Sequence, residues 1–398
     1  MASIINAATS GGLITTADTS GILQLQTAGT TAVTVDASQV ATFAQVANLP
    51  NTFGFKNRII NGAMVFDQRN AGASVTPTAS VYTLDRWRAV CSVSSKFSVQ
   101  QNAGAVTPPT GFTNYFGATS LSAYTVGSSE LFLIQQNIEG FNIADLSCGT
   151  ANAKTVTLSF WVRSSLTGTF GGSLRNGNAD RSYPFSYTIN SANTWEYETI
   201  TIDGDTTGTW ATNSSSGVSV NFSLGNGATV SNTAGAWVAG NFTSATGATS
   251  VVGTNGATLY ITGVQLEKGT QATSFDYRSY GIELVMCQRY CYKISTSGGY
   301  STFATTGQFV SATRVDFPIL FPTYMRASPT ATYTAANTYL PSSAGTDFTP
   351  SAVASVGGSA SPQAIAVNFT VSGGTAGRAA TLTDLNTTSS SMIFSAEL

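Results

Sequence analysis

The 398-residue sequence contains no histidine, and only 9% of its residues are charged. The missing histidine removes the commonest general base and excludes the Ser-His-Asp and Cys-His arrangements of hydrolases. The acidic residues are scattered, and no spacing pairs two of them across a glycosidic bond. We therefore expect a protein that is not an enzyme and that uses no cofactor.

Basic residues and long apolar runs are also scarce. With 17 Lys and Arg and a formal net charge of -2, the chain offers no basic face for phosphates, so nucleic-acid binding is not expected. No apolar run reaches the roughly 18 residues of a membrane span, and the start, MASIINAATSGG, lacks the basic and apolar regions of a secretory signal. We expect that the chain is not inserted into a membrane and that it is made in a cytosol.

Cysteine is rare, and its spacing matches no zinc site. Cys287 and Cys291 stand four residues apart in the best helix candidate, which is poor geometry for a disulfide. Together with Cys91 and Cys148, they are predicted to be buried free thiols of a chain made in a reducing compartment.

Aromatic and small polar residues are abundant, with 22 Phe, 15 Tyr and 5 Trp. Disordered chains lack such aromatics, and the many Thr, Ser, Gly and Asn residues favour strands and turns over helices. Clean alternation in TVTLSFWVR and VSVNFSLG predicts half-buried strands. In TLYITGVQLEKG the alternation shifts at Gly263, which predicts a β-bulge. The fold class is therefore all-β.

Four segments are predicted along the chain. Residues 1–56 hold short strands that cannot form a core alone and are expected to attach or trimerise the protein. Residues 57–278 form a central antiparallel sandwich. Residues 279–294, apolar on most sides, form a short helix buried all round. Residues 295–398 form a distal β-sandwich, in which Pro318 and Pro322 place the strand RVDFPILF at a sheet edge.

Three local patterns each leave two interpretations open. Trp195 and Tyr197 share one strand face opposite two isoleucines, so the pair either faces outward, against a sugar or another subunit, or lies half-buried under a loop. Asp203 and Asp205 suit oxygen coordination of Ca²⁺ or form a plain polar turn, and no other metal site is predicted. The ionic cluster of NRIINGAMVFDQRNAG and LDRWR favours a structural role over a ligand site; it comprises Asp67, Arg69, Asp85, Arg86 and Arg88.

Several sequence blocks resemble, in order, a domain of tail fibre and related fibre proteins of bacteriophages and prophages. They are NRIINGAMVFDQRNAGASV, YTLDRWR, LIQQNIEG, GTANAKTVTLSFWVRSS, NTWEYETITIDGDTTGTW, GATLYITGVQLEKGTQATSFDYRSYGIEL and CQRYCYK, spread over about 57–292. The C-terminal FPILFPTYMRASPTATYT and FSAEL are similar to a distal domain that often follows. The resemblance implies a carbohydrate-binding-like jelly roll in a virion component, usually a homotrimer, that contacts the bacterial surface.

From these observations we expect a phage fibre subunit that binds a host-surface glycan during adsorption, attached to tail or capsid proteins through residues 1–50. A head fibre or tail accessory protein with a purely structural role is the alternative, and a polysaccharide depolymerase is the third. Met286 and Tyr290 of the helix are candidates for the trimer axis; the alternative is that the helix is buried between the two β-regions of one chain. In the distal loops, Tyr333, Tyr339 and Phe348 are candidates for stacking on a neutral sugar or for packing the trimer tip.

Overall fold

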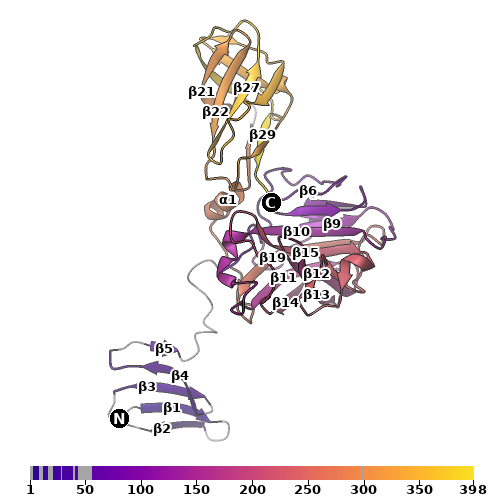
Figure 1. Ribbon diagram of the computed structural model, residues 1–398, viewed down its shortest axis with the longest axis vertical. Coiled ribbons are helices and arrows are strands. Elements are labelled where there is room, and N and C mark those ends of the chain that lie inside the picture. Colours follow the sequence, from indigo (N-terminus) through magenta and orange to yellow (C-terminus); the bar gives the residue numbers. More distant parts are fainter. Residues whose placement is uncertain are drawn as a thin grey trace. The chain divides into compact units, whose positions relative to one another are not determined.

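The computed structural model describes residues 3–8, 12–16, 21–27, 29–38, 41–43, 56–296 and 299–398. The chain divides into two units, Met1–Lys56 and Asn57–Leu398 (Figure 1). Within the described residues the fold is all-β, with one α-helix and a few 3₁₀ turns. None of the helices in this part of the chain is long and apolar enough to cross a membrane. The boundaries at 278 and 294 stay predictions.

The first unit contains one five-stranded sheet in the order β2-β1-β3-β4-β5. Its strands are β1 (Ser3–Ala8), β2 (Gly12–Thr16), β3 (Leu23–Thr27), β4 (Thr30–Val35) and β5 (Ala41–Phe43). Strands β1 and β3 pair in parallel, and the other pairs are antiparallel. Leu23 and Leu25 are 36% and 40% exposed, so one sheet face leaves apolar side chains in water.

The central region is a sandwich of two antiparallel sheets of jelly-roll type. The first, in the order β17-β13-β12-β15-β10-β7-β6, comprises β6 (Val81–Tyr82), β7 (Arg88–Cys91), β10 (Leu131–Glu139), β12 (Gly168–Asn176), β13 (Arg181–Ile189), β15 (Ser216–Asn226) and β17 (Val238–Ala239). The second, in the order β14-β11-β19-β9-β8, comprises β8 (Phe97–Gln101), β9 (Phe116–Ser120), β11 (Val156–Ser164), β14 (Glu196–Ile202) and β19 (Thr258–Lys268). A small parallel pair joins β16 (Ser231–Asn232) and β18 (Ser244–Ala245).

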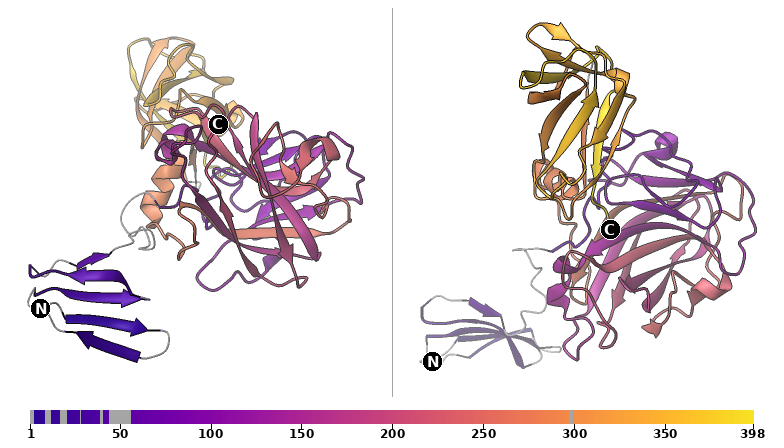
Figure 2. Two further views of the ribbon diagram at one scale, coloured as in Figure 1. Left: turned by 60° about the horizontal axis from the view of Figure 1, so that its bottom comes forward. Right: turned by 45° about the horizontal axis from the view of Figure 1, so that its top comes forward.

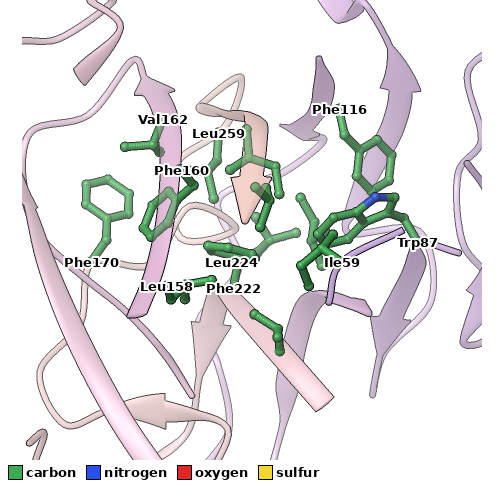
Figure 3. Packing of buried hydrophobic residues seen from close by; sticks show 14 of the residues in the cluster. Ile59, Trp87, Phe116, Leu158, Phe160, Val162, Phe170, Phe222, Leu224 and Leu259 are labelled. Carbon is green, nitrogen blue, oxygen red and sulfur yellow. The ribbon is translucent and has the colours of Figure 1, made fainter. Parts of the chain in front are cut away.

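The core between the two sheets follows from the alternation along their strands (Figure 3). Leu158 and Phe160 from β11 meet Phe222 and Leu224 from β15, and all four are fully buried. Phe160 and Phe222 pack edge to face with their ring centroids 4.9 Å apart. The predicted bulge is confirmed: opposite Gly263, which has φ +60°, the pairing of β11 with β19 shifts register.

The remaining elements lie after residue 279. Helix α1 (Tyr280–Gln288) is followed by a three-stranded sheet of β20 (Cys291–Ser295), β29 (Ser391–Ser395) and β23 (Thr330–Tyr333). A seven-stranded sheet in the order β25-β24-β28-β21-β22-β27-β26 faces it; these strands are β21 (Thr302–Ser311), β22 (Arg314–Leu320), β24 (Tyr339–Ser343), β25 (Thr346–Asp347), β26 (Ala352–Ser355), β27 (Ala364–Thr370) and β28 (Ala379–Asp384). In Figure 2 these distal strands, orange to yellow, form layers of their own.

The short 3₁₀ turns of the described residues lie in connections between strands. They are η2 (Ala103–Ala105), η3 (Gly140–Asn142), η4 (Ala144–Leu146), η5 (Ala228–Val230) and η6 (Ala336–Thr338).

Three details of the prediction are wrong. The helix expected over residues 279–294 is shorter, because α1 ends at Gln288 and strand β20 begins at Cys291. Strand β22 is not at a sheet edge, because it lies between β21 and β27. Pro318 is tolerated there because the pairing of β22 with β21 ends at Asp316. No hydrogen bond between β22 and β21 therefore needs the N–H that proline lacks. Helix α1 is not buried all round: only Cys287 is fully buried, whereas Ile282 is 59% exposed. The helix packs on the NRIING segment with one side and leaves the other side open.

Candidate functional site

The outer surface of the sandwich's five-stranded sheet, β14-β11-β19-β9-β8, carries a group of aromatic side chains outside the core between the two sheets. Along β11, Leu158, Phe160 and Val162 enter the core, so Trp161 points to the opposite side. Tyr197 lies directly across from Trp161 on β14, and their ring centroids are 5.3 Å apart. Tyr197 is 45% exposed, so this pair presents ring faces to solvent.

Two further groups of rings continue this surface. Gly263 separates Trp161 from Phe112: a Cβ at this glycine would come within 2.6 Å of Phe112 and 3.1 Å of Trp161. Phe112 packs against Phe275 and Tyr277 with centroid separations of 5.1 and 5.6 Å. We call the exposed and half-buried rings the aromatic face; it comprises Phe112, Trp161, Trp195, Tyr197, Phe275 and Tyr277, and the buried rings of Tyr115 and Tyr260 support Trp195 from below.

Polar groups border the rings and fix their positions. The indole N–H of Trp195 donates to the carbonyl of Thr107 at 2.9 Å. Arg163 donates from Nε to the carbonyl of Asn193 at 2.9 Å, and its guanidinium carbon lies 5.6 Å from the centre of the Tyr260 ring. Rings held in this way, beside hydroxyl and amide groups, match the alternating apolar faces and hydroxyl rims of a sugar.

A pocket of about 160 Å³ adjoins the aromatic face and shares Phe275 and Tyr277 with it. Its wall is mainly apolar, with Phe66 and Tyr280 in ring contact at 4.7 Å. Its two acidic groups, Asp276 and Glu283, both pair with Arg278, at 3.8 and 3.1 Å. The pocket is therefore suited to an apolar group rather than to a cation.

The structure separates the two residues of the predicted aromatic pair. Tyr197 faces outward, in agreement with the first interpretation. Along β14, Tyr197 and Thr199 are exposed, whereas Ile202 is buried. Trp195 is half-buried beneath the loop that contains Thr107, as the other interpretation holds, with its ring 5.5 Å from Tyr115.

The distal candidates do not form a common site. The prediction that Tyr339 stacks on a sugar is wrong. Tyr339 is fully buried in the distal core, and its hydroxyl donates to the carbonyl of Ser391 at 2.6 Å. It therefore has no face free for a sugar. Phe348 packs on Phe309 with centroids 4.8 Å apart. Tyr333 is half-buried, and its hydroxyl shares a 2.7 Å hydrogen bond with a serine of β26. A role of Tyr333 and Phe348 in binding stays a prediction.

Tyr290, a predicted trimer-axis residue, is also a correction. It is fully buried within one chain, where its hydroxyl donates to Glu139 at 2.6 Å and the Arg86 guanidinium carbon lies 3.5 Å from its ring centre. Burial raises the pKa of the Tyr290 hydroxyl well above its usual range. Met286 is half-buried against a cluster that includes Phe66. The open side of α1 instead presents Ile282 and Val285.

The Ca²⁺ alternative fails at Asp205. Its two carboxylate oxygens accept bidentate hydrogen bonds from Arg181 at 2.7 and 2.8 Å, and the side chain is 2% exposed. Asp203 is exposed and accepts a bond from Thr155 at 3.3 Å. In the part of the chain that the structure describes, no group of three His, Cys, Asp or Glu residues could hold a metal ion.

The charged residues of the opening motifs form a buried ionic network with the C-terminal FSAEL. Arg69 pairs with Asp85 at 3.4 Å and with Glu397 at 3.1 Å, and Arg86 also pairs with Glu397. We call these four residues the polar junction. Asp67 lies outside it and accepts the backbone N–H groups of a turn at 2.8 and 2.9 Å. This arrangement supports the structural interpretation for Asp67, Arg69, Asp85 and Arg86. Arg88 is the exception, because it takes no part in this network.

The cysteines are free, as predicted, although Cys91 and Cys148 are only half-buried. Burial raises the pKa of the Cys148 thiol to about 11 and that of Cys291 to about 12, so both remain protonated and unreactive at neutral pH.

The sequence analysis missed Trp161, Phe112 and Tyr277. A signal for Trp161 was available, because the alternation that places Leu158 and Phe160 in the core places Trp161 outside. Phe112 and Tyr277 lie in irregular segments about 165 residues apart, where no periodicity indicates which way a ring points.

No family model matches the chain, and no curated protein matches it. Solved structures with similarity include the enzymatically active domain of tailspike protein 4 of bacteriophage CBA120, at 12% identity and a TM-score of 0.28, covering 53% of this chain and 21% of that chain. A family 11 carbohydrate-binding module from Clostridium thermocellum, complexed with a mixed-linked tetrasaccharide, has 13% identity and a TM-score of 0.26, covering 49% and 97%.

A sugar-binding protein from Bacteroides thetaiotaomicron, itself described as putative, has 11% identity and a TM-score of 0.32, covering 54% of this chain and all of that one. TM-scores below 0.5 are too low to place this chain in any of these groups.

Proposed function

We propose that this protein is a non-enzymatic glycan-binding subunit of a bacteriophage fibre and that it contacts sugar through the aromatic face. The observation that carries the proposal is the outward pair of Trp161 and Tyr197 on a rigid sheet, continued by Phe112 and Tyr277. Aromatic faces exposed on a scaffold cost little entropy to order and stack on the C–H faces of sugar rings. The resemblance to phage fibre proteins supports a virion location and a bacterial surface glycan as partner.

Replacing Trp161 and Tyr197 together with alanine should weaken glycan binding at least tenfold, or about 1.4 kcal/mol, because stacked aromatics dominate such interfaces. The measurement is calorimetric titration with oligosaccharides chosen from an array of bacterial surface polysaccharides. Phe141→Ala is the matched control, since Phe141 is 61% exposed in the same sandwich but lies outside the aromatic face. Unchanged binding in the double variant, together with lost binding in Tyr333→Ala/Phe348→Ala, would move the site to the distal region.

The structural alternative, a head fibre or tail accessory protein, makes a different prediction. A receptor-binding subunit binds host cells and blocks infection when added in excess, whereas a purely structural subunit does neither. Gold-labelled antibody on phage particles would locate the protein on the tail or on the capsid. Release of reducing sugar from host polysaccharide would instead support a depolymerase and contradict the non-enzymatic assignment.

A homotrimer is part of the same proposal. Two apolar surfaces support it: Leu23 and Leu25 on the N-terminal sheet, and Ile282 and Val285 on the open side of α1. We expect light scattering at micromolar concentration to give three times the mass of one chain. Replacing Ile282 and Val285 with serine should shift the mass toward the monomer if α1 contributes to the interface. A monomeric wild type contradicts the trimer.

A further inference from the structure

The central sandwich has a second outer surface, on the seven-stranded sheet β17-β13-β12-β15-β10-β7-β6, on the other side from the aromatic face. Its middle strands carry polar rather than aromatic side chains. The strand register places Arg88 of β7 opposite Gln135 of β10, Gln135 opposite Asn221 of β15, and Asn221 opposite Ser173 of β12. Arg175 lies two residues beyond Ser173 on the same strand and therefore on the same face. One sheet surface thus combines two arginines with amide and hydroxyl groups.

The short polar side chains of this surface are buried and hydrogen-bonded to one another. Gln135 donates to Asn221 at 2.7 Å, and Asn221 donates to the hydroxyl of Ser173 at 3.0 Å. None of the three is more than 3% exposed. Arg88 and Arg175 are half-buried, so they are the members of the row that a ligand can reach.

Both arginines lack an acidic partner among the described residues, whereas most arginines of the chain form ion pairs. The Arg88 side chain makes no hydrogen bond within this set and lies 5.9 Å from the ring of Tyr82. Arg175 donates from Nη1 to Asn241 at 2.5 Å, but its Nε is buried without a partner. The terminal residue Leu398 accepts from Asn137 at 3.2 Å and forms no ion pair with either arginine.

The two guanidinium groups belong to the same sheet face, on strands β7 and β12, with β10 and β15 between them. Burial lowers the pKa of Arg175, and the charge of Arg88 lowers it further. In a chain with 9% charged residues, two cations left unpaired on one surface are unusual. An anion bound between them would relieve the repulsion through the accessible parts of the two guanidinium groups.

We propose that Arg88 and Arg175 form a second binding site, which takes the carboxylate or phosphate group of an anionic glycan. The guanidinium fork matches the planar, bidentate geometry of either group. That the anion belongs to a glycan rests on the proposed function, whereas the preference for an anion rests on the two arginines alone. The low net charge of the chain is compatible with this site, because only the local field at the two side chains matters.

The test uses three immobilised probes of equal length: an oligogalacturonate, a poly(glycerol phosphate) and a neutral galacto-oligosaccharide. Surface plasmon resonance of the full chain should show tighter binding of one of the anionic probes than of the neutral probe. Raising NaCl from about 50 to about 500 mM should weaken that binding, because salt screens the attraction. Arg88→Gln and Arg175→Gln should each reduce affinity for the anionic probe roughly tenfold.

Arg378→Gln is the matched control, because Arg378 is exposed, belongs to no ion pair of the described residues and loses the same charge. It should leave affinity unchanged. If Arg175→Gln fails to fold, Arg88→Gln gives the same answer. Equal affinity for acidic and neutral probes overturns the anion site and leaves the aromatic face standing. Binding of neither class overturns both, and loss of binding equally in Arg378→Gln shows a nonspecific charge effect and overturns the site.

Discussion

Replacing Glu397 with alanine should lower the free energy of unfolding by roughly 3–5 kcal/mol, the cost of removing one partner from a buried ion pair. Glu397 is 5% exposed and is the carboxylate that Arg69 and Arg86 share. Burial disfavours the charge on Arg86, and Glu397 overcomes that effect, so the pKa of Arg86 lies above its usual value. Without Glu397, Arg86, at 1% exposed, keeps its charge and has no acid beside it.

Urea unfolding followed by tryptophan fluorescence measures this loss at fixed protein concentration. Asp316→Ala is the control, because it breaks the 2.7 Å pair with Arg314, in which both side chains are more than a fifth exposed. Surface pairs contribute roughly 0–1 kcal/mol, so the control should unfold near the wild type. An equal effect of the two substitutions would show that the polar junction does not hold FSAEL against the sandwich.

The core strands could be predicted because their residues alternate strictly. Val218, Val220, Phe222 and Leu224 all enter the core, and Ile365, Val367 and Phe369 do the same in the distal region. Period-2 alternation depends only on local backbone geometry, so tertiary structure preserved it. Pro318 misled the prediction, since whether a strand is central or at an edge depends on where the neighbouring strand ends.

The two proposed binding surfaces were less predictable because they join residues that are distant in the sequence. Tyr339 has the sequence context of an exposed loop aromatic, yet it begins strand β24 and points into the distal core. Arg88 and Arg175 reach one surface only through the order of four strands, β7-β10-β15-β12. No spacing along the chain indicates that order. Helix α1 was predicted as a helix, but its open side depends on which neighbours the fold supplies.

The polar junction explains why so many charges are concentrated in NRIINGAMVFDQRNAG and LDRWR. Gln68 donates to the carbonyl of Cys291 at 2.9 Å, and Lys293 donates to the carbonyl of Arg69 at 3.1 Å. Arg326 donates to the carbonyls of Ala396 and Glu397 at 2.6 and 2.8 Å. The opening motifs therefore bind the residues after α1 and the C-terminal strand through groups that need fixed geometry.

The buried carboxyl of Asp85 should make stability depend on pH. Burial raises the pKa of Asp85 from 3.8 to about 6, although Arg69 acts in the opposite direction. Because the folded state binds this proton more tightly than the unfolded state, the contribution of Asp85 to the free energy of unfolding should rise as pH falls from about 6 to 4. It should stop changing below the unfolded pKa. The difference between the two pKa values corresponds to at most about 3 kcal/mol.

Asp85→Asn isolates this contribution, because asparagine keeps an oxygen for the Gln68 N–H, which Asp85 accepts at 3.2 Å, and does not titrate. Urea unfolding at pH 4, 5, 6 and 7 should show the wild type losing stability relative to the variant as pH rises through that window. Other titrating groups affect both proteins alike, so the difference between the two profiles reports Asp85. Parallel profiles would mean that Arg69, 3.4 Å away, holds the carboxyl ionised throughout the window and that burial does not dominate its pKa.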